Sequence, residues 1–195
     1  MNKPAPPLRN SPPPAELAQP HIRLDGNVGD EMLHAFRDGL AAVEGDEGPV
    51  VVELFTFGGD ADTGRLIATE IRLFRERTDR RVLFFGKAVV YSAGVTIMAA
   101  IPREDRWLSR GSSLLIHCRS LNKSLQLDGP LAGERVRLEA VLAEIDVGLK
   151  LEEEGFRELI AGSSLGLDEL IERARSNWYL DADEALARGL IGGVV

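Results

Sequence analysis

Ser92 stands at the head of an otherwise apolar run, YSAGVTIMAA at residues 91–100, and its position suits a nucleophile. A serine at the start of a helix that follows a strand projects from the edge of a sheet, where the helix N-terminal amides face a developing anion. The competing interpretation is that Ser92, Ala93 and Gly94 are small because the helix packs closely on the sheet. For an isolated Ser-Ala-Gly this second interpretation is favoured, so a catalytic role requires partners elsewhere in the chain.

Two other segments supply candidate partners for a serine nucleophile. Gly58 and Gly59 close the apolar run PVVVELFTF, and their backbone freedom allows an amide to face the crevice at the end of a strand. His117 ends the apolar run SSLLIH. Each segment also has a plainer explanation. The glycine pair can form an ordinary turn with Asp60 or Asp62 as the helix N-cap, and His117 can be a hydrogen-bonded core residue. The combination favours catalysis, because amide, hydroxyl and imidazole all follow strands.

Cys118 is the rival nucleophile and the single cysteine of the chain. Side chains alternate along a strand, so Cys118 is expected to face away from His117 and to pack in the core. One cysteine excludes an intramolecular disulfide framework and fits a reducing compartment. His21, His34 and His117 have no metal-ligand spacing, so we expect neither a metal nor another cofactor.

The charge balance and the apolar segments narrow the class of protein. A net charge of -8 and a pI near 5.0 argue against nucleic acid or an anionic membrane as the main partner. The N-terminal sequence lacks the apolar core of a signal peptide, and no stretch reaches the roughly 18 uninterrupted apolar residues of a membrane span. We therefore expect a soluble, cytoplasmic protein.

The order of apolar segments predicts one α/β domain over residues 21–195. Residues 1–20 hold seven of the ten prolines and are expected to form a disordered arm. After it, apolar runs typical of strands alternate with segments of helical periodicity, which indicates a largely parallel sheet. The strands are expected within residues 21–28, 49–57, 81–90, 106–109, 112–117 and near both ends of 177–195.

The segment from Gly133 to Ala161 predicts an unusually long helix. No proline interrupts it, and its apolar residues recur at helical intervals: Leu138, Leu142, Ile145, Leu149, Phe156 and Ile160. At 1.5 Å per residue such a helix is about 40 Å long, more than a domain of this size needs to cover one sheet. Part of it is therefore expected to project toward a partner subunit.

Four blocks, ELFTFGGDADTG, YSAGVTIMAAIP, SSLLIH and NWYLDADEALARGLI, resemble in order the signature blocks of ClpP, the proteolytic subunit of the Clp proteases. The resemblance covers nearly everything from Ile22 to Ile191. It implies the ClpP/crotonase fold, an α/β fold of repeated β-β-α units with a mostly parallel sheet and a long projecting helix. It also implies a serine-type endopeptidase that acts on peptides or unfolded proteins, a homo-oligomer in the form of a ring, and an ATPase unfoldase partner.

Carried over position by position, the resemblance makes Ser92 the nucleophile and His117, 25 residues later, the general base. Gly59 and Ala93 become the amides of the oxyanion hole. This matches the chemistry of acyl transfer, in which an imidazole takes the serine proton and two N–H donors hold the tetrahedral oxyanion.

Asn177 departs from the family pattern, because it stands where the family has its triad aspartate. An asparagine can hold the imidazole but supplies no charge for the imidazolium, so hydrolysis is expected to be slow unless Asp181, Asp146 or another carboxylate reaches His117. One alternative is therefore a catalytically impaired homologue that acts as an assembly or regulatory subunit. Others are a crotonase-type acyl-CoA enzyme and a Ser-Lys dyad with Lys87.

Two further departures flank the candidate residues. The interval from glycine to serine in GKAVVYS is two residues longer than the family has, and the loop SLNKSLQLDGP replaces a glycine-rich segment that leads into the long helix.

Overall fold

The computed structural model describes residues 12–195, so the expectation for residues 1–11 of the proline-rich arm lies outside the described residues. Ala15–Ala18 form a short 3-10 helix, η1, and Leu17 within it is buried. Leu17 belongs to a small apolar cluster on one face of the sheet with Val51, Leu83, Phe85 and Trp107. The packed part of the chain therefore begins upstream of His21, within residues that the sequence assigned to the arm.

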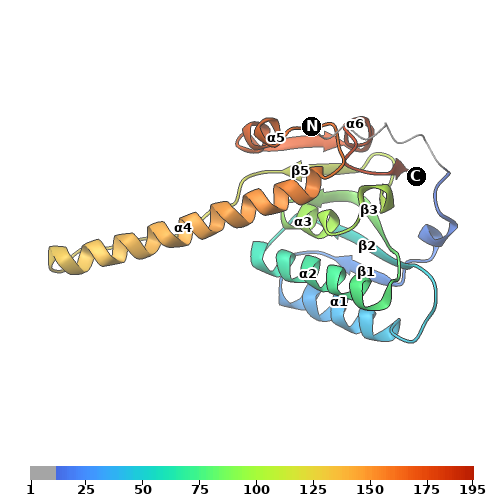
Figure 1. The fold of residues 1–195 in the computed structure, drawn as a ribbon, viewed down its shortest axis with the longest axis horizontal. Coiled ribbons are helices and arrows are strands. Elements are labelled where there is room, and N and C mark those ends of the chain that lie inside the picture. Colours follow the sequence, from blue (N-terminus) through green and yellow to red (C-terminus); the bar gives the residue numbers. More distant parts are fainter. Residues whose placement is uncertain (1–11) are drawn as a thin grey trace.

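A seven-stranded sheet lies at the centre of the fold (Figure 1). Strands β1 (Ile22–Asp25), β2 (Val50–Thr56), β3 (Val82–Tyr91), β4 (Arg106–Leu108) and β7 (Gly193–Val194) pair in parallel in the order β1-β2-β3-β4-β7. A sixth strand, β5 (Ser113–Ile116), pairs in parallel with the end of β3. Only β6 (Trp178–Asp181), which pairs with β5, is antiparallel. The predicted α/β fold with a mostly parallel sheet is confirmed.

The helices bury the apolar faces that their periodicity predicted. They are α1 (Asp30–Ala42), α2 (Ala61–Thr78), α3 (Ala93–Ala99), α4 (Leu131–Ile160), α5 (Leu167–Ala174) and α6 (Ala182–Ala187), with a 3-10 helix, η2, at Arg103–Asp105. Phe36 of α1 and Ile67 of α2 are fully buried, and both belong to the main core cluster with Leu54 and Phe84 of the sheet. Burial of these apolar side chains is the main force that holds the layers together.

A bulge in β3 accounts for the longer interval before Ser92. Leu54 of β2 pairs with Gly86, but Thr56, two residues later, pairs with Val90, four residues later. The two extra residues therefore loop out of the pairing, with Ala88 at a positive φ of 54°. Before the bulge β3 pairs with β4, and after it with β5. The sheet thus branches at this point, and β5 comes to lie beside the residues that lead into Ser92.

Helix α4 extends far beyond the rest of the fold (Figure 1). Its 30 residues agree with the predicted long helix, and only its C-terminal part packs on the domain, through Phe156 and Leu159. Apolar residues along α4 remain exposed, among them Leu138, Leu142, Ile145 and Leu149.

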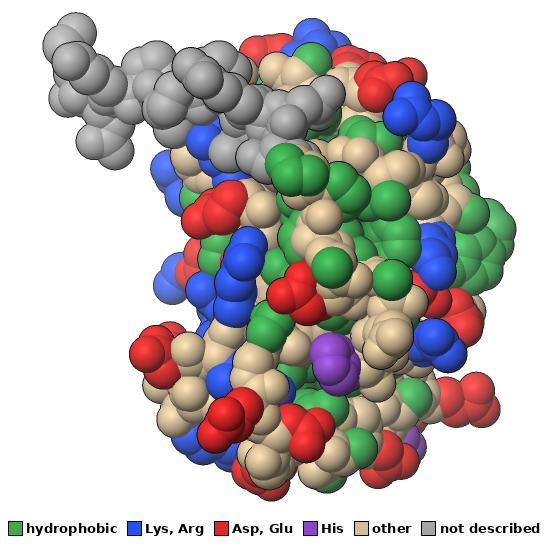
Figure 2. Space-filling model, turned by 90° about the vertical axis from the view of Figure 1, so that its right-hand side faces the viewer, with side chains coloured by type: hydrophobic (Ala, Val, Ile, Leu, Met, Phe, Trp, Pro, Cys, Tyr) green, Lys and Arg blue, Asp and Glu red, His purple; other side chains and the backbone are tan. Residues whose placement is uncertain are grey.

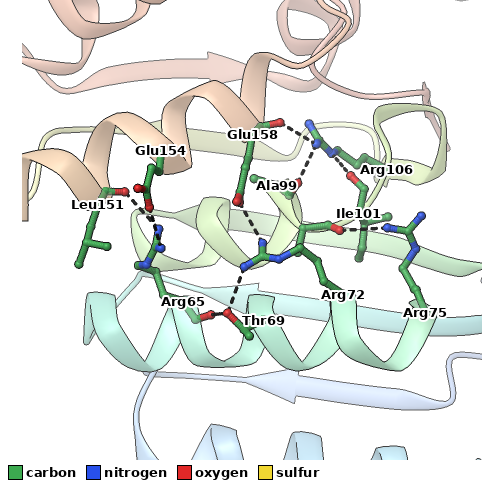
Figure 3. Close-up of polar contacts among 11 residues, drawn as sticks. Arg65, Thr69, Arg72, Arg75, Ala99, Ile101, Arg106, Leu151, Glu154 and Glu158 are labelled. Carbon is green, nitrogen blue, oxygen red and sulfur yellow. Dashed lines mark hydrogen bonds and ion pairs between the residues drawn. The ribbon is translucent and has the colours of Figure 1, made fainter. Parts of the chain in front are cut away.

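Arginines from α2 and β4 fasten the packed end of α4 (Figure 3). Arg65 donates to the carbonyl of Leu151 at 3.2 Å and to Glu154 at 3.2 Å, and Arg72 donates to Glu158 at 2.9 Å. Arg106 of β4 donates to main-chain carbonyls at the ends of α3 and α4, and its side chain is buried. These contacts fix the position of α4 relative to α2 and α3.

The face seen in Figure 2, opposite the projecting helix, mixes acidic and basic side chains around a patch of hydrophobic ones. Among the helices of residues 12–195, none has the length and apolar character required to cross a membrane.

Candidate active site

Ser92 sits in a strained turn between β3 and α3. Its φ of 55° and ψ of -117° lie outside the regions that most residues occupy, and it is the N-cap residue of α3. The Ser92 N–H donates to the carbonyl of Leu115 at 2.9 Å, which ties the turn to β5. Strain of this kind at a strand-to-helix turn is typical of nucleophile elbows, because it exposes the hydroxyl above the sheet.

The small residues around Ser92 are also required by packing. A Cβ on Gly58 would lie 2.7 Å from the Cβ of Ser92, and a Cβ on Gly94 would lie 2.4 Å from the Cγ2 of Thr56. Close packing and a catalytic serine are therefore compatible in this segment. Ser92 itself still lines an open cavity of about 520 Å³ between the sheet edge, α2 and α4.

The amides of Gly59 and Ala93 face no hydrogen-bond acceptor among residues 12–195. Gly59 has a φ of 150° and passes so close to Val28 that a Cβ would lie 2.3 Å from its carbonyl oxygen. By contrast, the Gly58 amide donates to Thr56 Oγ1 at 3.0 Å. Gly59 and Ala93 both line the same cavity as Ser92, so their N–H groups are free to bind an anion there.

Asp60 follows the glycine pair and is the N-cap of α2. The sequence had offered Asp60 or Asp62 for this role. Its side chain accepts a hydrogen bond from the N–H of Thr63 at 2.7 Å, and this bond lowers the pKa of the Asp60 carboxyl. Asp60 therefore stays ionised at the positive end of α2.

His117 follows the last residue of β5 and lines the cavity with Ser92. Its Nδ1 lies 2.7 Å from the carbonyl oxygen of Cys118. A carbonyl can only accept, so Nδ1 carries the proton and Nε2 of the neutral ring has the free lone pair of a base. The sequence predicted that Ser92 and His117 both follow strands, and the structure places both residues at one cavity.

Asn177 lies at the same end of the β5–β6 pair as His117 but does not hold the imidazole. Ile116 pairs with Trp178 at the end of the β5–β6 ladder, so His117 and Asn177 both adjoin that end of the ladder. Asn177 is exposed, has a positive φ of 57°, and its side chain makes no hydrogen bond within the described part of the chain. The group that touches the imidazole on its Nδ1 side is a main-chain carbonyl.

The two carboxylates considered as substitutes for the triad acid are engaged or turned elsewhere. Asp181 lies at the far end of the β5–β6 pair, opposite Ser113, and caps α6 by accepting from the N–H of Glu184 at 2.7 Å. Asp146 of α4 is not among the residues that line the cavity, although its neighbours Ile145 and Val147 are. Neither contacts His117.

The expectation that Cys118 faces away from His117 rested on strand alternation, which does not extend to residues 117 and 118 because β5 ends at Ile116. Both residues line the cavity, and Cys118 also packs against the main core cluster. Burial raises the pKa of the Cys118 thiol, and the nearby Glu152 carboxylate raises it further. The thiol is therefore protonated at neutral pH, which agrees with its interpretation as a packing residue and not a nucleophile.

Glu152 was not identified from the sequence. It lines the cavity from α4, and one carboxylate oxygen accepts the backbone N–H of Arg119. The signal that could have found it is its place on the apolar stripe of the long helix, three residues after Leu149 and four before Phe156.

Lys87 is not part of the cavity. It lies in the bulge of β3, pairs with Glu53 and sits over the ring of Phe85, 5.0 Å from its centroid. Nothing in this arrangement supports a Ser-Lys dyad. No group of three or more histidine, cysteine, aspartate or glutamate residues within residues 12–195 is arranged to hold a metal ion.

Comparison with known proteins adds independent observations. No protein-family model matches the sequence. It is 28% identical over 180 residues to ATP-dependent Clp protease proteolytic subunit 2 of Treponema pallidum, with 89% of this chain and 81% of that protein covered. The protein of the same name from Pseudomonas aeruginosa is 24% identical over 156 residues, which cover 80% of this chain and 69% of the relative.

Among solved structures, an asparagine-to-aspartate mutant of ClpP1 from Listeria monocytogenes has a similar fold. The TM-score is 0.69 at 17% sequence identity, and the match covers 89% of this chain and 90% of the other. The two sequence relatives are named as Clp protease proteolytic subunits, and the structural neighbour is named ClpP1. Taken with the fold described above, these similarities support the assignment of this chain to the ClpP family.

Proposed function

We propose that this protein is a ClpP-like serine peptidase that hydrolyses peptide bonds through an acyl-enzyme on Ser92. The observation that carries the proposal is that Ser92, His117 and two unpaired amides, those of Gly59 and Ala93, line one cavity. Nε2 of His117 would take the proton of the Ser92 hydroxyl as the oxygen attacks the substrate carbonyl. The two amides would bind the oxyanion of the tetrahedral intermediate, and the imidazolium would protonate the leaving amine.

The substrate that suits the cavity is an extended peptide. Apolar residues of α4, including Ile145 and Leu149, line the cavity together with Ile116 of β5. Its charged lining residues are of both signs: Arg65, Arg119, Asp60, Asp62, Glu144 and Glu152. A peptide with apolar side chains fits such a lining better than a small charged metabolite would. Peptide or unfolded-protein substrates, delivered by an ATPase unfoldase, are accordingly part of this proposal.

A fluorophosphonate probe tests the proposal directly, because it phosphonylates only a serine that is activated and held by an oxyanion hole. We expect mass spectrometry to find the adduct on Ser92 and no adduct in Ser92→Ala. The Ser92→Ala protein must show the same thermal unfolding as the parent chain for the comparison to hold. A folded parent chain that fails to react would contradict the peptidase assignment.

A catalytically impaired subunit is the second candidate, favoured by the environment of His117. The imidazole Nδ1 is held by a neutral carbonyl, and Asn177 offers no carboxylate. Labelling separates the two candidates, because an impaired subunit with an intact elbow would react only slowly with the probe, whereas a competent peptidase would react within the usual assay time.

Self-association through α4 is also proposed, because the helix leaves apolar side chains unpacked. The side chains of Leu142 and Leu149 are 59% and 57% exposed. Exposed apolar side chains that gather on one helix are typical of a surface that contacts another subunit. Replacing both by glutamate is expected to reduce the sedimentation coefficient toward that of a monomer. Lys150→Glu adds the same charge at a polar, exposed position and should leave the assembly unchanged. An assembly that survives the double substitution would locate the subunit contacts elsewhere.

A further inference from the structure

One peptide group links His117 to a carboxylate. The peptide unit between Cys118 and Arg119 accepts a hydrogen bond on its carbonyl oxygen from His117 Nδ1, at 2.7 Å. The N–H of the same unit, which belongs to Arg119, donates to the carboxylate of Glu152. The chain of contacts therefore runs from imidazole through a single peptide bond to a negative charge.

The geometry of a peptide unit makes this link effective. In a trans peptide the C=O and N–H bonds point in opposite directions, so a carboxylate at the N–H end and an imidazole at the C=O end lie on one line of dipoles. Hydrogen bonds in such a chain polarise one another, and the effect is larger away from bulk water. The charge of Glu152 thus makes the Cys118 carbonyl a stronger acceptor for the His117 proton.

Both ends of this link are fixed by other contacts. The residues beside Glu152 are held by Arg65, which donates to the Leu151 carbonyl and to Glu154. The guanidinium of Arg119 pairs with Asp62 of α2 at 2.6 Å. The loop after His117 is therefore clamped between α2 and α4, and the peptide unit is held in one orientation.

We propose that Glu152 is the positioning residue for His117, acting through the Cys118–Arg119 peptide in place of the triad acid that Asn177 does not supply. The inference rests on the proposed Ser92–His117 peptidase, but its contacts exist independently of catalysis. Glu152 would keep the proton on Nδ1, hold the ring in place and stabilise the imidazolium that forms during the reaction.

Glu152→Gln tests the charge while keeping an oxygen that can accept the Arg119 N–H. A hydrogen bond to a charged group is stronger than a neutral one, and the difference in free energy corresponds to a rate change of about tenfold. We therefore expect kcat to fall about tenfold with little change in KM. The matched control is Glu153→Gln, the same change on the solvent side of α4, where Glu153 contacts Arg157. The control should keep the parent rate, and both variants should keep the parent unfolding midpoint.

Imidazole ¹⁵N spectra give a readout that does not depend on turnover. His21 Nδ1 accepts from the Val51 N–H at 3.0 Å, so neutral His21 carries its proton on Nε2 and serves as an internal reference for the opposite tautomer. In the parent chain His117 is expected to show a protonated Nδ1, with the resonance assigned from a His117→Gln variant. Glu152→Gln should lower the population of this tautomer at His117 and leave His21 unchanged.

Asn177→Asp separates positioning by charge from simple support of the loop. A carboxylate at residue 177 supplies the missing charge directly, so Glu152→Gln should cost much less in that background. An equal loss in both backgrounds, with an unchanged His117 tautomer, would overturn the inference and leave Glu152 as a loop support. A Glu152→Gln variant that hydrolyses at the rate of the parent chain would also overturn the inference. Failure of the fluorophosphonate probe to label the parent chain would refute the proposed peptidase, and the imidazole spectra would still test the contact between Glu152 and His117.

Discussion

Asn177→Asp is expected to raise kcat for small peptide esters by about 10² to 10⁴-fold. The upper figure is the cost of the reverse change in a serine protease triad. Residue 177 directly precedes Trp178, the partner of Ile116, so it adjoins the end of the β5–β6 pair that leads into His117. Its positive φ of 57° is one that aspartate tolerates nearly as well as asparagine. The gain should fall below the upper figure, because Nδ1 must leave the Cys118 carbonyl to reach the new carboxylate.

Single-turnover and steady-state hydrolysis of an activated ester would measure this gain. Asn177→Gly is the matched control, because glycine relieves any backbone strain at this φ without adding charge, and it should not increase the rate. Combining Asn177→Asp with Ser92→Ala should remove the gain completely, which would show that it passes through Ser92. An unchanged rate in Asn177→Asp would mean that the new carboxylate does not reach His117, or that Glu152 already fills its role.

The sequence could locate the reacting groups because each one is tied to a strand end. Parallel strands place their carboxyl ends at the same edge of a sheet, so a glycine pair, Ser92 and His117 after three such strands were expected to meet. The structure places them at one cavity. This part of the site follows from local patterns alone.

What holds His117 could not be predicted in the same way. Strand alternation fails once β5 ends at Ile116, so the orientation of Cys118 and Arg119 depends on tertiary contacts. Glu152 lies 35 residues after His117 on a helix whose rotation about its axis is set by Arg65 and Arg72 of α2. No short-range rule connects a side chain on that helix to a loop peptide.

The branch in the sheet shows a similar limit. The interval before Ser92 was visibly two residues too long, but the sequence did not say where the extra residues go. They loop out between Gly86 and Val90, where Ala88 takes a positive φ, and the register downstream is preserved. A bulge absorbs an insertion without moving the residues on either side, which is why Ser92 keeps its place.

Arg106→Met is expected to lower the free energy of unfolding by about 3 kcal/mol. The Arg106 side chain is fully buried and donates to five main-chain carbonyls: Ala99, Ile101, Glu158, Leu159 and Leu190. Ala99 is the last residue of α3, and Glu158 and Leu159 lie in the last turn of α4, where a positive charge also offsets the helix dipoles. Figure 3 shows the bonds from Arg106 to Ala99, Ile101 and Glu158. Burial lowers the pKa of Arg106 to about 10, so the group remains charged at neutral pH.

Methionine fills similar space but donates no hydrogen bond, so several buried carbonyls lose their partners at once. The free-energy cost of these unpaired carbonyls outweighs the desolvation cost that is saved when the buried charge is removed. Arg106→Lys has three donors for five acceptors, and its loss should be intermediate. Urea unfolding at fixed protein concentration measures both, and the midpoint should fall without a change in slope. Arg110→Met, at an exposed position four residues later, should stay within about 0.5 kcal/mol of the parent. If Arg106→Met were equally stable, the carbonyls would have found other partners, and α3 and α4 would not depend on this side chain for their relative position.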